Sequence, residues 1–75
     1  MTLLDAKTNE ALRVVDIMAG GRLQQSLAHL GIEVGSVIRI RRNAPFSGPF
    51  VIQCNEAETA IGRGIASKIL VEPIR

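Results

Sequence analysis

Few residues in this sequence could carry out acid–base or nucleophilic chemistry. His29 is the single histidine, and Ser26 precedes it by three residues, a spacing that brings two side chains to one face of a helix. Such a pair could act as nucleophile and base, but no acidic residue is placed to orient the imidazole and no oxyanion-binding segment is evident. Because the helix dipole favours a cation near the last turn, we interpret His29 as a solvated helix-end residue. The sequence therefore predicts a protein that is not an enzyme.

A second group of side chains has the types that bind transition metals. Cys54, Glu56 and Glu58 are spaced two residues apart, so they would share one side of an extended segment, and His29 is a further candidate. However, the sequence has no pair of cysteines or histidines at the spacings typical of metal sites. Glutamates beside a turn are ordinarily solubilising residues, and an unpaired cysteine is most often a small buried residue. We predict no metal site, no cofactor and a structural role for Cys54.

The composition indicates one small folded domain. The 75 residues are 47% hydrophobic, and their apolar runs are far shorter than the ~20 residues that cross a bilayer. The formal net charge of +2 is too small to predict nucleic-acid binding by itself. We therefore expect residues 1–75 to form a single domain that is cytoplasmic and does not insert directly into a membrane.

Hydrophobic periodicity predicts five strands and one helix. Leu23, Leu27 and Leu30 form one stripe of an amphipathic helix, which Gly31 would end as a left-handed C′ residue with Ile32 packed back on Leu27. Runs of alternating or β-branched residues indicate the strands. The predicted strands are 11–17, 36–42, 50–54, 59–62 and 68–72, with the helix at 22–30 and a single helical turn at 63–69.

The number and shortness of these strands predict the fold class. Five short strands bury a core best by curling, which also removes exposed sheet edges. We therefore predict a mainly β fold, namely a small SH3-like five-stranded β-barrel with one inserted short α-helix.

The segment RIRRNAPFSGPF, residues 39–50, indicates an interaction surface. Its first arginines alternate with isoleucines and project to one side, and the loop after them holds a phenylalanine between two stiffening prolines. An ordinary solvated face would explain the same arginines, and the ring could instead cap its own barrel. Phe50 is as well suited to the core as to a surface. We predict that an acidic partner binds Arg39, Arg41, Arg42, Pro45, Phe46 and Pro49.

An ordered set of segments resembles one known family. The set is a glycine-rich helix start and LGI in GGRLQQSLAHLGIEVG, then the basic strand RIRR, the turn APFSGP, the segment IGR and a closing strand ending in ILV. In this order and spacing, over roughly residues 12–72, the sequence resembles the FeoA family. That family usually has a proline before the second glycine of GIEVG, where this sequence has Val34.

The resemblance implies a non-catalytic SH3-like module that assists ferrous-iron uptake by a FeoB-type membrane permease. Its expected partner is the cytosolic part of that permease, and a homo-oligomer is left open. The same module forms the C-terminal domain of iron-dependent repressors, so a stand-alone regulatory domain is one alternative. A nucleic-acid-binding small barrel is another, although the low charge and the presence of only two aromatic rings argue against it.

Overall fold

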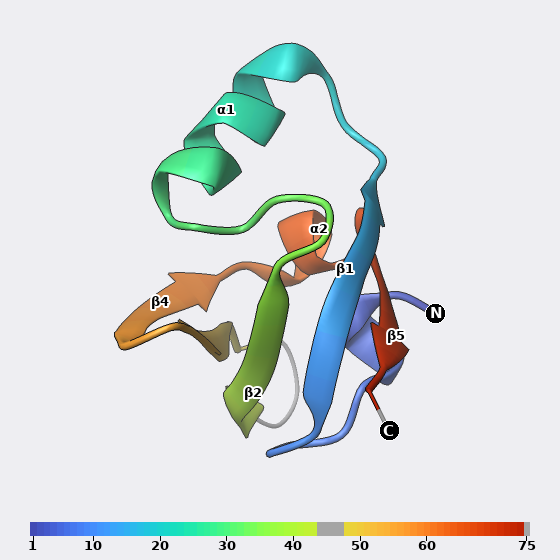
Figure 1. The fold of residues 1–75 in the computed structure, drawn as a ribbon, viewed down its shortest axis with the longest axis vertical. Coiled ribbons are helices and arrows are strands. Elements are labelled where there is room, and N and C mark those ends of the chain that lie inside the picture. Colours follow the sequence, from blue (N-terminus) through green and yellow to red (C-terminus); the bar gives the residue numbers. More distant parts are fainter. Residues whose placement is uncertain (44–47, 75) are drawn as a thin grey trace.

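The computed structural model of the chain describes residues 1–43 and 48–74 and shows one curled antiparallel sheet with its longest helix above one end (Figure 1). Five strands form the sheet in the order β4-β3-β2-β1-β5. The elements in chain order are η1 (Leu3–Asp5), β1 (Ala11–Ile17), α1 (Gly21–His29), β2 (Val37–Asn43), β3 (Phe50–Cys54), β4 (Ala57–Ile61), α2 (Arg63–Ala66) and β5 (Ile69–Pro73). The predicted class, mainly β with five strands and one inserted helix, is confirmed.

The sheet joins strands that are far apart in the sequence. The strand β1 lies between β2 and β5 and pairs antiparallel with both of them. Two strands contain an extra residue relative to their neighbours, Val15 in β1 and Arg41 in β2. An extra residue increases the local twist and bend of a strand, which helps a short sheet to curl over its core.

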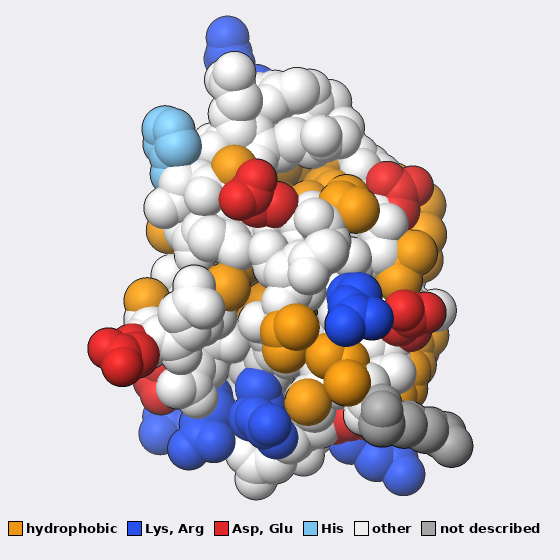
Figure 2. Space-filling model, in the orientation of Figure 1, with side chains coloured by type: hydrophobic (Ala, Val, Ile, Leu, Met, Phe, Trp, Pro, Cys, Tyr) orange, Lys and Arg blue, Asp and Glu red, His pale blue; other side chains and the backbone are white. Residues whose placement is uncertain are grey.

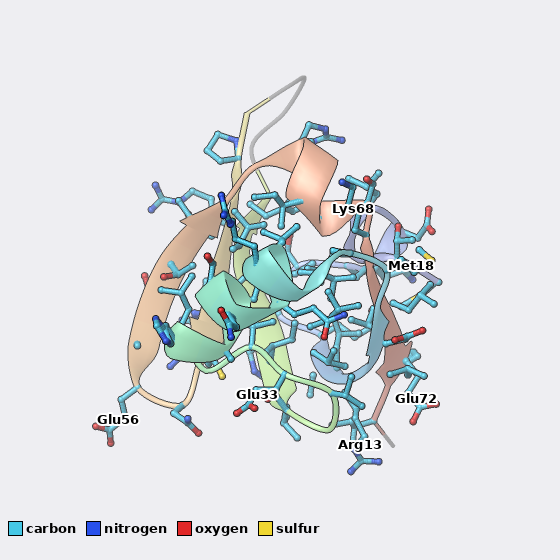
Figure 3. The ribbon with its side chains drawn as sticks, turned by 90° about the horizontal axis from the view of Figure 1, so that it is seen from above. Arg13, Met18, Glu33, Glu56, Lys68 and Glu72 are labelled. Atoms are coloured by element: carbon cyan, nitrogen blue, oxygen red, sulfur yellow. The ribbon has the colours of Figure 1, made fainter. Side chains whose placement is uncertain are left out.

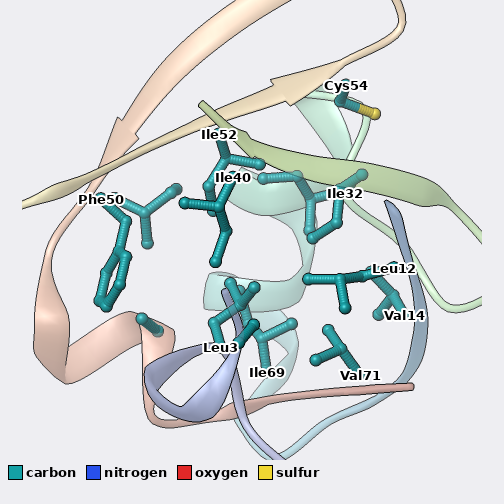
Figure 4. Close-up of a cluster of buried hydrophobic side chains, with 14 of the residues drawn as sticks. Leu3, Leu12, Val14, Ile32, Ile40, Phe50, Ile52, Cys54, Ile69 and Val71 are labelled. Carbon is teal, nitrogen blue, oxygen red and sulfur yellow. The ribbon is translucent and has the colours of Figure 1, made fainter. Parts of the chain in front are cut away.

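One continuous core fills the concave side of the sheet (Figure 4). Alternate side chains of β1, β2, β3 and β5 point into it, as Phe50, Ile52 and Cys54 of β3 do, and β4 adds Ile61. Figure 4 shows the ring of Phe50 at one side of this cluster and Leu3 of η1 beneath it. The N-terminal segment is thus part of the core, since both Leu3 and Ala6 are buried. The sequence did not predict η1, because so short an element has no periodicity.

The end of α1 confirms the predicted stop signal. Gly31 has φ +87°, and its N–H donates to the carbonyl of Ala28, while the N–H of Ile32 donates to the carbonyl of Leu27, both at 2.9 Å. These two bonds define a Schellman motif, and Ile32 and Leu27 are both buried. The loop after α1 is therefore fixed against the core.

The predicted start of β4 is wrong. The strand β4 begins at Ala57, whereas the sequence indicated a turn over residues 55–58 and a strand from residue 59. Asn55 has φ 59°, so it occupies the left-handed region that a two-residue hairpin turn requires, and Cys54 pairs directly with Ala57. No helix in the part of the chain that the structure describes is long and apolar enough to span a bilayer.

Candidate partner-docking surface

Strand β2 presents its arginines to the outside of the sheet. Ile38 and Ile40 are buried, whereas the residues that follow them, Arg39 and Arg41, are exposed. Simple alternation would turn Arg42 inward, but the extra residue in β2 pairs Arg42 with the outward-facing Val51. The bulge therefore places three arginines on one outer face.

A turn before β1 holds two of these arginines. The Nη1 of Arg39 donates to the backbone carbonyl of Asn9, and the Nη1 of Arg41 donates to Oδ1 of Asn9 at 3.5 Å. Asn9 has φ 69° and its N–H donates to the carbonyl of Ile40 at 2.7 Å, so the turn is itself tied to β2. These contacts restrict the guanidinium groups without burying them, which lowers the entropy cost of binding a partner.

Two shallow depressions lie along this face. One, of about 260 Å³, is lined by Arg41, Arg42, Val51 and Glu58. The other, of similar volume, is lined by Ala11, Val37, Ile38, Arg39, Gln53 and Asn55. Figure 2 shows Lys and Arg side chains gathered at the lower end of the molecule, below β2, whereas acidic side chains are scattered over the view. The face thus combines positive charge with small apolar areas.

The predicted loop residues are only partly visible. Pro49 is exposed and lies immediately before β3, but Pro45 and Phe46 fall outside the described residues. Phe50 is fully buried, with the guanidinium carbon of Arg63 at 5.1 Å from the centre of its ring. Of the two aromatic rings, Phe50 therefore belongs to the core.

A groove that the sequence did not indicate lies between α1 and the loop over residues 31–36. It has a volume of about 490 Å³ and is lined by Ile17, Gly21, Gln24, Gln25, Ala28, Glu33 and Val34. In the view of Figure 3, Glu33 lies next to α1, on the loop that follows this helix. Val34 is 62% exposed, the largest value among the large apolar side chains of the described residues. The one available signal was this exposed valine in place of the family's usual proline.

Comparisons with known proteins identify the family of this chain. The sequence model of the FeoA domain matches residues 1–73. The chain belongs to the FeoA family. A curated relative from Methanocaldococcus jannaschii, named as a candidate Fe(2+) transport protein A, is 42% identical over 67 residues, which cover 89% of this chain and 79% of the relative.

Solved structures of FeoA proteins have the same SH3-like fold. The crystal structure of an iron uptake regulatory protein (FeoA) superimposes with a TM-score of 0.90 at 27% identity, covering 99% of this chain and 97% of the other. The solution structure of FeoA from Chlorobium tepidum also gives 0.90, at 25% identity, with 100% and 71% coverage. The repressor ScaR with bound Cd2+ gives 0.88 at 27% identity, but the match covers only 35% of that longer chain.

The FeoA-family chain keeps its other candidate groups apart. His29 is exposed in the last turn of α1, as predicted, and Ser26 is exposed as well. Cys54 points into the core, Glu56 lies at the tip of the β3–β4 turn (Figure 3), and Glu58 lies on the outer face. Among residues 1–43 and 48–74, no three His, Cys, Asp or Glu side chains are close enough to hold a metal ion.

Cys54 of this FeoA-family chain is a buried structural thiol. Its Sγ lies 3.0 Å from the carbonyl oxygen of Gly31, to which the S–H donates, so it links β3 to the end of α1. Burial raises the pKa of the thiol above its ordinary value, and the carboxylate of Glu33 raises it further. The folded protein therefore keeps Cys54 protonated and poorly nucleophilic.

We expect this raised pKa to make the protein less stable at alkaline pH. The unfolded chain ionises near the ordinary thiol pKa of about 8.5, whereas the folded chain holds its proton, so unfolding is favoured as the pH rises above that value. The decline should not exceed about 1.4 kcal/mol per pH unit. Urea unfolding between neutral and alkaline pH measures it, and Cys54→Ala is the control. The control carries the contribution of every other group that titrates in this range, so the difference between the two curves belongs to Cys54. Parallel curves for the two proteins would contradict the assignment.

Proposed function

We propose that this chain is a non-catalytic accessory protein of ferrous-iron uptake that binds the cytosolic part of a FeoB-type permease. Membership of the FeoA family and a relative named for Fe(2+) transport support the process. The outer face of β2 supports binding as the mode of action, because it offers three exposed arginines and two shallow depressions. We expect the module to act from the cytoplasm.

The observation that carries this proposal is the set of three outward arginines on β2. Arg39, Arg41 and Arg42 lie on one face, and Asn9 orients two of them. Bidentate pairing of guanidinium groups with carboxylates gives such a face a preference for an acidic partner segment. We extend the surface on sequence grounds to Pro45, Phe46 and Pro49, with the ring of Phe46 as its apolar anchor.

The test is an NMR titration of labelled protein with the cytosolic domain of the permease, with and without guanine nucleotide. We expect amide shifts to cluster on residues 39–50. The double variant Arg39→Glu/Arg42→Glu should weaken binding by about tenfold or more, since both charges are reversed at the contact. Arg22→Glu is the matched control, because Arg22 is exposed on α1 at a different part of the surface. Equal weakening by the control variant would show that only net charge matters and would contradict the proposed face.

The structure weakens the nucleic-acid alternative. Single-stranded nucleic acids are usually held by exposed rings that stack on bases, and Phe50 is fully buried. A mobility-shift assay at low salt decides this point, with no shift expected at micromolar protein. A salt-sensitive shift that Arg39→Glu/Arg42→Glu abolishes would instead favour nucleic acid as the ligand of this face.

A further inference from the structure

The two edge strands of the sheet, β5 and β4, differ in whether another segment pairs with them. The outer side of β5 is covered by the N-terminal segment, since Thr2 bridges to Leu70 and the N–H of Val71 donates to the carbonyl of Met1 at 2.8 Å. The strand β4 is the other edge. Within residues 1–43 and 48–74 no segment pairs with its outer side, and Figure 3 shows β4 at the rim of the molecule. One edge of this sheet is therefore open.

The hairpin register identifies the free backbone groups of β4. Cys54 pairs with Ala57 across a two-residue turn, so this pair is hydrogen-bonded, and so is the pair Ile52 and Thr59. Alternate residues of an antiparallel strand direct both of their backbone groups to the same side. The N–H and C=O groups of Glu58 and Ala60 consequently face away from β3, toward the open edge.

Little on β4 discourages the addition of another strand. The β3–β4 register runs without a bulge, unlike the registers of β1 and β2. The exposed side chains of Ala57 and Ala60 are small, and Glu58 shares a depression with two arginines. Natural edge strands are usually protected by bulges, prolines or lysines, so a regular and open edge of this kind is suited to pairing.

We propose that β4 pairs antiparallel with β4 of a second copy of this chain, which joins the two sheets into one. Thr59 of each copy lies at the twofold axis, and Glu58 of one copy is opposite Ala60 of the other. Each such pair then exchanges both of its backbone hydrogen bonds, because these are the residues whose groups face outward.

Two neighbouring registers of the β4–β4 pair are less favourable, one because of charge repulsion and the other because of an occupied carbonyl. A shift that brings Glu58 opposite Glu58 of the other copy places like charges directly across the strands. A shift that brings Glu58 opposite Gly62 would require the Gly62 carbonyl to accept a hydrogen bond from the other copy. That carbonyl already accepts from the N–H of Ala66 at 2.9 Å. Of these three registers, only the one centred on Thr59 pairs free backbone groups within Ala57–Ile61 and separates the Glu58 side chains.

Charge complementarity supports a second copy as the occupant. In the register centred on Thr59, Glu56, in the turn just before one β4, comes opposite Gly62 of the other copy and next to its Arg63. Glu56 is exposed and Arg63 is half-buried, so both can reach across the junction. The twofold axis repeats this pairing at the other end, and the edge is therefore complementary to itself.

The first test is sedimentation of the purified protein from micromolar to millimolar concentration. We expect a concentration-dependent dimer that Ala60→Pro abolishes while the melting temperature of the monomer changes little, since that N–H faces the open edge. The matched control is Ala60→Ser, which keeps the N–H and should keep the dimer. A dimer that survives Ala60→Pro would overturn the proposal.

Disulfide trapping tests the register without depending on the proline variant. In the Thr59→Cys variant, oxidation should join residue 59 of one copy to residue 59 of the other, because these residues meet at the twofold axis as a close non-hydrogen-bonded pair. Ala60→Cys faces Glu58 of the other copy and should cross-link much more slowly, while the native Cys54 is buried. Faster cross-linking at position 60, or none at either position, would overturn the proposal. A protein that stays monomeric at all concentrations would also overturn the proposal. If Ala60→Pro then abolished permease binding, a strand of the partner would be the occupant of the edge.

Discussion

Replacing Phe50 by alanine is expected to lower the free energy of unfolding by about 3 to 5 kcal/mol. The ring is fully buried in the single core, so its removal leaves a cavity as well as losing contacts. A domain of this size has a total stability of only about 4 to 11 kcal/mol, at 0.05 to 0.15 kcal/mol per residue. The variant should therefore be close to unfolding at room temperature, as urea titration followed by circular dichroism would show.

Two other substitutions distinguish the stability that comes from burying the Phe50 ring from that of its neighbours. Val51→Ala, on the outer face of the same strand, should cost less than about 1 kcal/mol because Val51 is only half-buried. Arg63→Ala removes the guanidinium from the Phe50 ring and should also cost about 1 kcal/mol or less. If Phe50→Ala were no more harmful than Val51→Ala, burial of the Phe50 ring would not be a main source of the stability.

The second large effect is expected for Gly31→Ala, which should lower the free energy of unfolding by about 1 to 3 kcal/mol. Gly31 has φ +87°, a conformation that strains any residue with a Cβ, and that Cβ would lie 3.2 Å from the Sγ of Cys54. The Schellman motif that ends α1 and the thiol contact to β3 would both be disturbed. Thermal unfolding of the variant measures the loss.

The matched control for Gly31 is another glycine of the same loop. Gly35 has φ +93°, but a Cβ there would meet nothing within 4 Å, so Gly35→Ala reports the backbone strain alone. The difference between the two variants is the cost of pushing Cys54 aside. We expect Cys54→Ala to reduce that difference, and an unchanged difference would show that the sulfur is not the obstacle.

Local patterns predicted most of the fold because they act over a few residues. The leucine stripe ending at Gly31 located α1 and its cap, and alternation located β3 to the residue. The hairpin turn at Asn55 was misplaced because one left-handed asparagine, which leaves no hydrophobic signature, allowed a tighter turn. The element η1 went unrecognised because its burial depends on β5, which is distant in the sequence.

The site was less predictable than the fold. The sequence shows that Arg39 and Arg41 alternate, but Arg42 faces outward only because of a bulge that arises between two strands. The contacts of Asn9 with both arginines join residues about thirty positions apart, which no local pattern contains. The groove beside Val34 likewise depends on how α1 rests over its loop.

The proposed dimer bears on the docking surface. A twofold axis perpendicular to a continuous sheet leaves the outer faces of both copies on the same side. The arginines of two β2 strands would then be presented together, so a partner with two acidic segments would bind more tightly than each contact alone allows. Titration of Ala60→Pro with the permease domain would separate this gain from the affinity of one face.

The position of β1 between β2 and β5 also determines when the protein can become native during its synthesis. The chain emerges from the ribosome N-terminus first, so β1 can pair with β2 early, while its other side and Leu3 of η1 have no partner until Ile69–Pro73 appears. Apolar side chains made first are consequently the ones that wait longest for burial. Nascent chains ending before β5 should therefore be the ones that require protection by chaperones.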